Sequence, residues 1–240
     1  GQISHLSTSA IAALTTAQAK ALTTASINAL TSAQVTAIET ADLAAMSTAQ
    51  LSKLGTAQVA QLTSVQVAAL TSGQVKSLNS DQVAALTSAQ LNALTSSQLP
   101  SLSTAQVRAL TTDQLSKLTT TQIVGLSTAQ VAALSTGQVA ALTSVQINAL
   151  ASDDLKALTT TQVRALTSDQ LSKLSSDQIA LMATDDIAAL STGQISHLST
   201  SAIAALTTDQ ISALNTATID AMTSAQVQAF TSAQIGALPY

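Results

Sequence analysis

The chain contains no cysteine, which excludes disulfide bonds and metal sites built on thiolates. Residues of the Phe, Tyr and Trp types are almost absent as well, with only Phe230 and Tyr240 among 240 residues. A hydrophobic core must therefore be built from Leu, Val, Ile and Ala, although 46% of all residues are hydrophobic. Disorder driven by charge repulsion needs low hydrophobicity and high charge, and this composition has neither, so we expect a folded chain.

Charge is equally scarce, because only 8% of residues are charged and the formal net charge is −4. Nucleic-acid binding needs clustered basic residues that displace counterions, but here the basic residues are scattered and form no run. The sequence therefore predicts no nucleic-acid partner. The basic residues are Lys20, Lys53, Lys76, Arg108, Lys117, Lys156, Arg164 and Lys173.

Long apolar runs are missing too, and we therefore predict no membrane insertion. The chain does not open on a signal peptide, so secretion would require an export signal outside this segment. The absence of cysteine also suits an oxidising, extracellular setting.

Hydrophobic residues recur with a strict period of eight. An apolar residue, here called the anchor, stands at Leu6 and at every eighth position through Leu238. Three residues before each anchor stands Val, Ile or Leu in twenty-nine of the thirty units, and Gln precedes that residue in twenty-three. The sequence therefore predicts one uninterrupted array of thirty octads over residues 1–240, a fragment of a longer array.

Two hydroxyl positions follow each anchor, which gives the formula L-[ST]-[ST]-x-Q-[VIL]-x-A. The first position tolerates other residues, such as Glu39 and Ala151, whereas the second is Thr or Ser in every octad until Tyr240 ends the chain. We expect this stricter second hydroxyl to cap a helix in some octads. Residues 1–16 and 193–208 are identical, which indicates duplication of a larger block.

Each octad is typical of a short helix followed by a bend. In residues 63–70, TSVQVAAL, Val67 and Leu70 share one face of a helix but would lie on opposite faces of a strand. Thr63 and Gln66 match a capping box, in which the hydroxyl accepts from the Gln backbone N–H while the Gln side chain reaches back. The pattern predicts an all-α solenoid with one helix of about five to seven residues in each octad, because helices so short need stacked neighbours.

Two other folds explain the pattern less well. In one continuous helix the apolar face would rotate by about 80° per octad and would face no partner for long. A β-solenoid can carry Thr and Gln ladders, but the three-residue apolar spacing and the alanine content favour helix. The size of the coil stays open, since two or three equivalent octads would both close one turn.

Candidates for chemistry are few. His5 and His197 are the only histidines, and both stand where Ala usually stands in the octad. Catalysis by Ser, His and Asp needs several groups that converge, as does metal binding, and neither histidine has such a setting. We therefore predict no enzymatic activity, no catalytic, cofactor-binding or metal-binding residue, and no cofactor.

Acidic residues offer no clearer site. The adjacent pairs 153–154 and 185–186 are Asp-Asp, but neither has the glycine turn and the several oxygen ligands that calcium prefers. Asp113 lies four residues before Lys117, and Asp169 four before Lys173, which predicts ion pairs on the surface of a helix.

The segments LTSAQVAAL, LSTAQVAAL and LTTDQLSKL resemble octapeptide arrays in very large bacterial proteins that carry adhesin or haem-utilisation labels. The resemblance spans the whole chain and implies a cell-surface or secreted location. No haem ligand set is present in the sequence.

These observations predict a structural repeat segment, that is, a stiff spacer, stalk or filament-forming region of a large bacterial surface or secreted protein. Such an array would stack with further repeats or with itself, because equivalent octads provide no polar end caps. The alternative is a binding module that presents a repeated solenoid face to ice, carbohydrate or a protein partner. That function would need one uniform face, whereas the variable positions of the octad differ widely, as at Lys20, Pro100 and Gln228.

Overall fold

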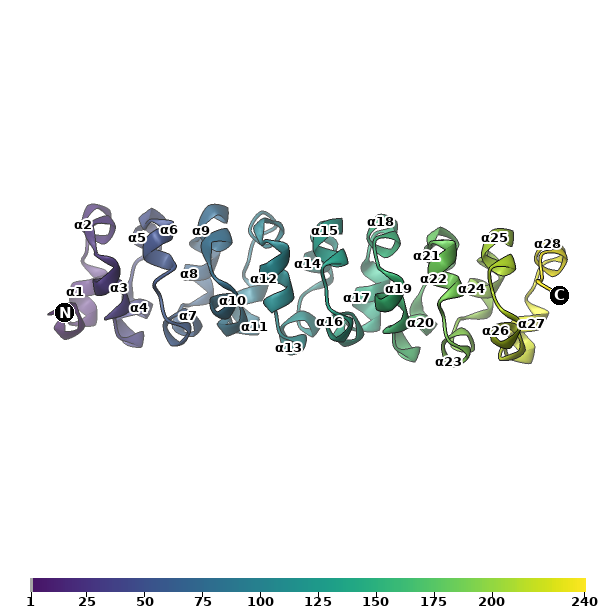
Figure 1. Ribbon diagram of the computed structural model, residues 1–240. Coiled ribbons are helices and arrows are strands. Elements are labelled where there is room, and N and C mark those ends of the chain that lie inside the picture. The colour runs from purple at the N-terminus through teal and green to yellow at the C-terminus, as the bar shows by residue number, and fades with distance from the viewer. Residues whose placement is uncertain (1) are drawn as a thin grey trace. The chain divides into compact units, whose positions relative to one another are not determined.

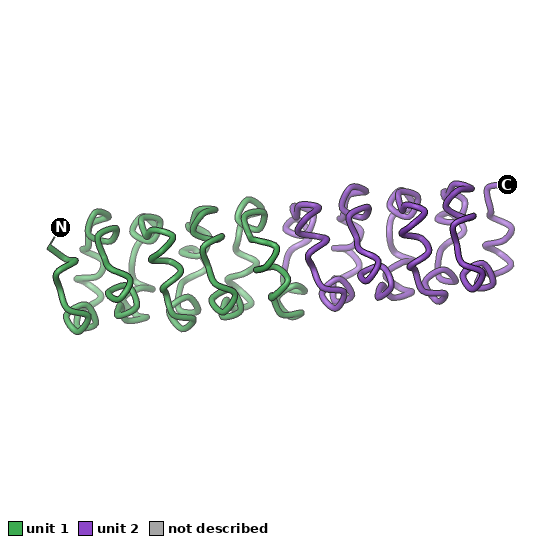
Figure 2. Tube along the Cα trace, turned by 90° about the horizontal axis from the view of Figure 1, so that it is seen from below, with its two compact units in different colours: residues 1–125 green, residues 126–240 purple. Residues whose placement is uncertain are grey.

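Short helices are the only regular secondary structure in residues 2–240, which this computed structural model describes (Figure 1). Each octad holds one helix, so the predicted all-α solenoid is confirmed, and the β-solenoid is wrong for the described residues. The α-helices are four to six residues long, slightly shorter than predicted. The chain divides into two units, residues 1–125 and 126–240, which Figure 2 shows in different colours.

The first unit consists of a 3-10 helix, eleven α-helices, a second 3-10 helix and three further α-helices. In order they are η1 (Gln2–His5), α1 (Thr8–Ala12), α2 (Thr16–Ala21), α3 (Thr24–Asn28), α4 (Ser32–Ala37), α5 (Thr40–Ala45), α6 (Thr48–Leu51), α7 (Thr56–Gln61), α8 (Ser64–Ala69), α9 (Ser72–Ser77), α10 (Ser80–Ala85), α11 (Ser88–Asn92), η2 (Leu99–Ser101), α12 (Thr104–Ala109), α13 (Thr112–Ser116) and α14 (Thr120–Val124).

The second unit contains only α-helices. In order they are α15 (Thr128–Ala132), α16 (Thr136–Ala141), α17 (Ser144–Ala149), α18 (Ser152–Lys156), α19 (Thr160–Arg164), α20 (Ser168–Lys173), α21 (Ser176–Leu181), α22 (Thr184–Ala188), α23 (Thr192–Ile195), α24 (Thr200–Ala205), α25 (Thr208–Ser212), α26 (Thr216–Asp220), α27 (Ser224–Gln228) and α28 (Ser232–Gly236).

The bend between octads is made by two extended residues. The anchor Leu70 leaves α8 with φ −62° and ψ 144°, and Thr71 precedes α9 with φ −72° and ψ 157°. Both conformations are close to polyproline II, which L-amino acids adopt readily. No described residue has a positive φ, so the array turns at each octad without glycine. This explains how a chain with only seven glycines can bend so often.

Three octads make one coil. In the first unit α4 packs against α1 and α5 against α2, and in the second unit α20 packs against α17 and α24 against α21. Figure 1 shows α2 and α5 side by side. Each of these pairs is three octads, or 24 residues, apart in the sequence. Of the two coil sizes that the sequence left open, the three-octad coil is therefore the one adopted.

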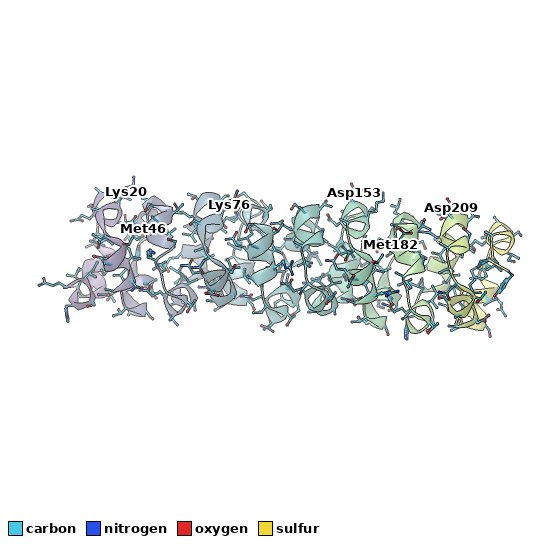
Figure 3. All side chains as sticks on the ribbon, viewed as in Figure 1. Lys20, Met46, Lys76, Asp153, Met182 and Asp209 are labelled. Atoms are coloured by element: carbon cyan, nitrogen blue, oxygen red, sulfur yellow. The ribbon has the colours of Figure 1, made fainter. Side chains whose placement is uncertain are left out.

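Each inner octad contributes two side chains to the core, as the sequence predicted, whereas the octads near both ends bury fewer. Val67 and Leu70 are only 1% and 4% exposed. The anchors Met46 and Met182 are buried in the same way, whereas charged side chains such as Lys20 and Asp153 are exposed on the outside of the coils (Figure 3). Burial of these aliphatic side chains is the main contribution to stability, because a helix of six residues is not stable alone.

Pro100 changes the helix type of its octad. A proline has no backbone N–H and therefore cannot donate the bond that would continue an α-turn here. The octad forms the 3-10 helix η2 instead of an α-helix, yet its core residues Leu99 and Leu102 stay buried. Core packing thus survives a local change of helix type.

Candidate functional site: a glutamine ladder and its interruptions

The first hydroxyl after the anchor is the helix cap. Thr63 adopts an extended conformation, and its hydroxyl accepts from the backbone N–H of Gln66 at 3.1 Å. In return, Oε1 of Gln66 accepts from the backbone N–H of Thr63 at 2.8 Å. The capping box predicted for this octad is therefore confirmed.

The same glutamine also binds the preceding coil. Nε2 of Gln66 donates to the carbonyl oxygens of Val35, Thr36 and Ile38 at 3.0, 3.2 and 2.8 Å. These carbonyls lie at the C-terminal end of α4, where a helix leaves its last carbonyls without internal partners. One buried amide thus provides an acceptor for a backbone N–H at the start of its own helix and a donor for the backbone carbonyls at the end of a helix in the preceding coil.

We call this repeated contact the glutamine ladder. Its donors are spaced 28 to 31 residues from their acceptors, and the Nε2-to-carbonyl distances are 2.5 to 3.4 Å. The members in the first unit are Gln34, Gln50, Gln58, Gln66, Gln74, Gln82, Gln90, Gln98, Gln106, Gln114 and Gln122. Those with acceptors in the second unit are Gln162, Gln170, Gln178, Gln194, Gln210, Gln226 and Gln234.

Reasoning from the sequence identified the cap but missed the contact between coils. A capping box accepts either Glu or Gln at its third helical position. In this chain the position is Gln in twenty-three octads and Glu in none. Of these two side chains only that of Gln offers an acceptor and a donor together when Glu is ionised, so the complete absence of Glu was the available signal for a second bond.

Aspartate interrupts the ladder at three octads, where it replaces Gln and supplies no donor when ionised. The residues are Asp42, Asp154 and Asp186, each at most 4% exposed. Their N-caps lack a hydroxyl, and none of the three helices has a side-chain cap. The substitution of Gln by Asp and the loss of the capping hydroxyl therefore occur in the same octads.

The three aspartates meet different surroundings. Oδ2 of Asp42 is buried and has no hydrogen-bond partner. Oδ1 of Asp154 accepts from the hydroxyl of Thr128 at 2.9 Å. Burial raises the pKa of Asp186 above its ordinary value of 3.8, and the adjacent charge of Asp185 raises it further. Both causes make the Asp186 carboxyl harder to ionise than that of an exposed aspartate.

The second hydroxyl after the anchor does not cap the helix, and the expectation that it would do so in some octads is wrong for the described helices. The Oγ of Ser64 donates to the carbonyl of Ala89 at 3.4 Å, and that of Ser72 to the carbonyl of Ser97 at 3.2 Å. Both acceptors are 25 residues later, on the next coil. The second residue is already helical, and the first hydroxyl already occupies the N–H groups of the cap.

Removing the two hydroxyls should therefore have different effects. We expect Thr63→Ala to lower the free energy of unfolding by about 1 kcal/mol, because the N–H of Gln66 loses its acceptor. The matched variant Ser64→Ala should change the stability by less than about 0.5 kcal/mol, since its long bond is partly exposed. Urea unfolding followed by circular dichroism measures both; a larger loss for Ser64→Ala would contradict the assignment of the cap.

Both histidines lie at exposed positions. His5 ends the 3-10 helix η1 in the first unit and is exposed, and His197 follows α23 in the second unit and is also exposed. No group of three His, Asp or Glu side chains within residues 2–240 could hold a metal ion. The absence of an enzymatic activity stays a prediction.

The two Asp-Asp pairs do not form a common binding site, and only one of the two predicted Lys–Asp ion pairs is present. In each Asp-Asp pair the first carboxyl is exposed and the second is buried in the ladder position, so the two do not converge on a common ligand. Lys117 and Asp113 form the predicted surface ion pair at 2.9 Å. Asp169 and Lys173 do not pair in the described structure, and that prediction is wrong. Both side chains are exposed, where the loss of side-chain entropy offsets most of the Coulomb attraction.

Two depressions lie where the repeat deviates from its pattern. One, of about 230 Å³, lies beside Pro100 and is lined by Asn92, Leu99 and Gln122 among others, with no acidic or basic side chain. The other, of about 440 Å³, lies beside Thr218, which replaces Gln in the ladder. Its one charged residue is Arg164, whose Nε donates to the carbonyl of Ala189 at 3.0 Å. Neither depression brings together a nucleophile, a base and a group that orients them.

No helix in residues 2–240 has the length and apolar character needed to cross a lipid bilayer.

Comparison with known proteins identifies the repeat. The family model described as the ALTTAQ repeat matches residues 35–72, 68–96, 88–120, 115–144, 147–184, 179–216 and 212–239. Together these matches cover more than half of the chain. The six letters occur in this sequence as residues 13–18, which comprise an anchor, both hydroxyls and the glutamine of the capping box. None of the curated proteins matches the chain.

Proposed function

Because the chain belongs to the ALTTAQ repeat family and repeats one bonding pattern from coil to coil, we propose that it is a structural repeat segment: a stiff spacer, stalk or filament-forming region of a large bacterial surface or secreted protein. The glutamine ladder is the observation that carries this proposal. It joins successive coils by the same buried bonds, so coils can be added without a new kind of contact. Stability in such an array is a sum over neighbouring repeats.

A mechanical role also suits the buried, directional character of the ladder. Hydrogen bonds between coils run from a side-chain amide to the carbonyls at a helix end, and water is excluded from them. Separation of two coils would exchange these bonds for bonds to water and would expose the core side chains, and this exposure of apolar surface is the main cost. We propose a single array over residues 1–240 with this resistance to separation, located extracellularly or at the cell surface, and without catalytic activity or binding of nucleic acid.

A repeated binding face has less support. The side chains on the outside of the coils differ in charge and size, as Lys20, Lys76, Asp153 and Asp209 illustrate (Figure 3). A flat ligand such as ice or a carbohydrate lattice would favour a uniform row.

The spacer proposal predicts that the length of the array can be set by whole coils. Duplication of residues 56–79, which make one coil of 24 residues, should increase the maximum dimension by roughly 8–10 Å, the usual distance between packed helices. Small-angle scattering measures this increase, and thermal unfolding should show no additional transition. Duplication of residues 56–67 is the control, because twelve residues disrupt the octad register and should lower the helical signal. A whole-coil insertion without elongation would contradict the spacer role.

A further inference from the structure

Thr218 leaves one position of the glutamine ladder without an amide. The octads on either side carry Gln210 and Gln226, whose Nε2 atoms donate to carbonyls 31 and 28 residues earlier at 2.7 to 3.0 Å. Thr218 is only 1% exposed, and its hydroxyl donates to Oδ1 of Asn215 at 3.0 Å, within its own octad. A hydroxyl has a single proton to donate, so Thr218 supplies no bond to the preceding coil.

Two backbone groups lack the partners that a ladder glutamine would provide at this position. The amide nitrogen would bond to the carbonyl of Leu190, which lies 28 residues before Thr218. The amide oxygen would accept from the backbone N–H of Asn215, as Oε1 of Gln210 accepts from that of Thr207 at 2.8 Å. Within residues 2–240 neither the carbonyl of Leu190 nor the N–H of Asn215 is bonded. One acceptor and one donor thus stand at the spacing that a single primary carboxamide satisfies.

The gap opens into the depression of about 440 Å³ beside Thr218, because Leu190 and Asn215 both belong to its lining. This volume lies within the range of roughly 300–1,000 Å³ that is usual for small-molecule sites. The hydroxyl residues Ser191 and Thr192 also line the depression. A small molecule that enters it can therefore reach the position that the glutamine amide occupies in other octads.

Arg164 adds a positive charge to the same depression. Its Nε donates to the carbonyl of Ala189 at 3.0 Å, and its own carbonyl accepts from Nε2 of Gln194 at 3.2 Å, so both its side chain and its backbone are held in place. The terminal nitrogens of the guanidinium have no protein partner among the described residues, and none of the residues that line the depression is acidic. A guanidinium with free terminal N–H groups is suited to bind a carboxylate.

We propose that this depression binds a small molecule that carries both a primary carboxamide and a carboxylate, with free glutamine as the test ligand. The carboxamide occupies the gap at Thr218, where it donates to the carbonyl of Leu190 and accepts from the N–H of Asn215. The carboxylate binds the guanidinium of Arg164. The inference goes beyond the structural role, because it assigns a ligand to one interruption of the ladder.

An NMR titration of the isotope-labelled 240-residue chain with L-glutamine tests the proposal. We expect saturable shifts of the backbone N–H signals of Asn215 and Ser191 that give one dissociation constant. L-Glutamate is the matched ligand, because it has nearly the same size but lacks the amide donor, and its dissociation constant should be at least about tenfold higher. Propionamide keeps the amide and lacks the carboxylate, and it should also bind at least about tenfold more weakly.

Variants of the chain show whether the ligand occupies this gap. Thr218→Gln fills the gap with an amide of the chain itself and should raise the dissociation constant for glutamine at least about tenfold. Ala202→Gln is the control, because Ala202 also stands at a ladder position but does not line the depression, and this variant should bind glutamine as the wild type does. Arg164→Met should remove the preference for glutamine over propionamide. Circular dichroism confirms that each variant is folded.

Three results would overturn the proposal: a wild-type chain without saturable shifts at any soluble concentration of glutamine, equal binding of glutamine and glutamate, or unchanged binding of glutamine by Thr218→Gln. None of them affects the spacer role, which depends on the elongation of the array by whole coils and is measured without a ligand.

Discussion

Replacing Gln66 by Glu is expected to lower the free energy of unfolding by about 3 kcal/mol at pH 7. The Glu side chain keeps the acceptor that binds the N–H of Thr63, so the helix cap survives. What it loses is the amide donor to Val35, Thr36 and Ile38, and an ionised carboxylate then faces three carbonyl oxygens in a buried position. Removal of a buried donor lowers the free energy of unfolding more than removal of a donor on the surface. The reason is that the buried acceptors cannot form hydrogen bonds to water instead.

Gln18→Glu is the matched control for this prediction. Gln18 forms the same capping box with Thr15, but its side chain is exposed and its Nε2 has no carbonyl partner in the described residues. We expect its replacement to change the stability by less than about 0.5 kcal/mol. Chemical unfolding of both variants at pH 7 and at pH 4 separates the effect of the lost ladder donor from that of the helix cap. At pH 4 the carboxyl introduced by Gln66→Glu is protonated and can donate, so part of the lost stability should return. Equal effects at the two positions would show that the ladder contributes little beyond the caps.

The local structure of the octad could be predicted because it depends on neighbours in the sequence. Thr63 and Gln66 lie three residues apart, so their capping box requires only a helix start. Val67 and Leu70 likewise reveal the buried face through their spacing alone. The family match confirms the repeat but adds no geometry to these local assignments.

The size of the coil could not be predicted, because it depends on backbone angles at the bend. Leu70 and Thr71 are both extended, and a modest change in either ψ would redirect the next helix without altering the hydrophobic pattern. Because all octads have similar sequences, no difference between them marks which two are stacked. The only information on stacking lay in the type of side chain at the ladder position.

The role of the hydroxyls shows a second limit of the sequence. A strict residue type suggested that the second hydroxyl had the more important bond, but the first hydroxyl is the cap. The cap tolerates substitution in part because other groups can serve it: in the octad of Asn79 the side-chain amide oxygen accepts from Gln82 at 2.9 Å. How strictly a residue type recurs at one position of the repeat thus does not show how much that position contributes to stability.

Converting Asp186 to Gln should raise the free energy of unfolding by about 2 kcal/mol at pH 7, because it restores a donor to an interrupted ladder. The ladder spacing places this side chain near the carbonyls of Leu155 and Leu158, as Gln178 and Gln194 are placed near theirs. The new Oε1 would also accept from the N–H of Ala183, whose helix lacks a side-chain cap. The buried charge of Asp186 disappears at the same time.

The advantage of Asp186→Gln should depend on pH in a defined direction. Burial and the neighbouring Asp185 raise the pKa of Asp186 in the folded chain above its ordinary value of 3.8. A group with a raised folded pKa contributes stability that is fully present below its unfolded pKa and is lost as the pH rises through the folded pKa. The wild-type chain should therefore gain stability relative to the variant as the pH falls from 7 toward 4, and the difference between them should shrink.

Asp209→Asn distinguishes this mechanism from a general effect of negative charge. Asp209 lies on α25, which packs against α22, but its side chain is exposed. The variant removes one negative charge, as Asp186→Gln does, without adding a donor to the ladder. We expect its stability to follow the wild type within about 0.5 kcal/mol at each pH. If Asp209→Asn stabilised the chain as much as Asp186→Gln, net charge would be the cause and not the missing bond between coils.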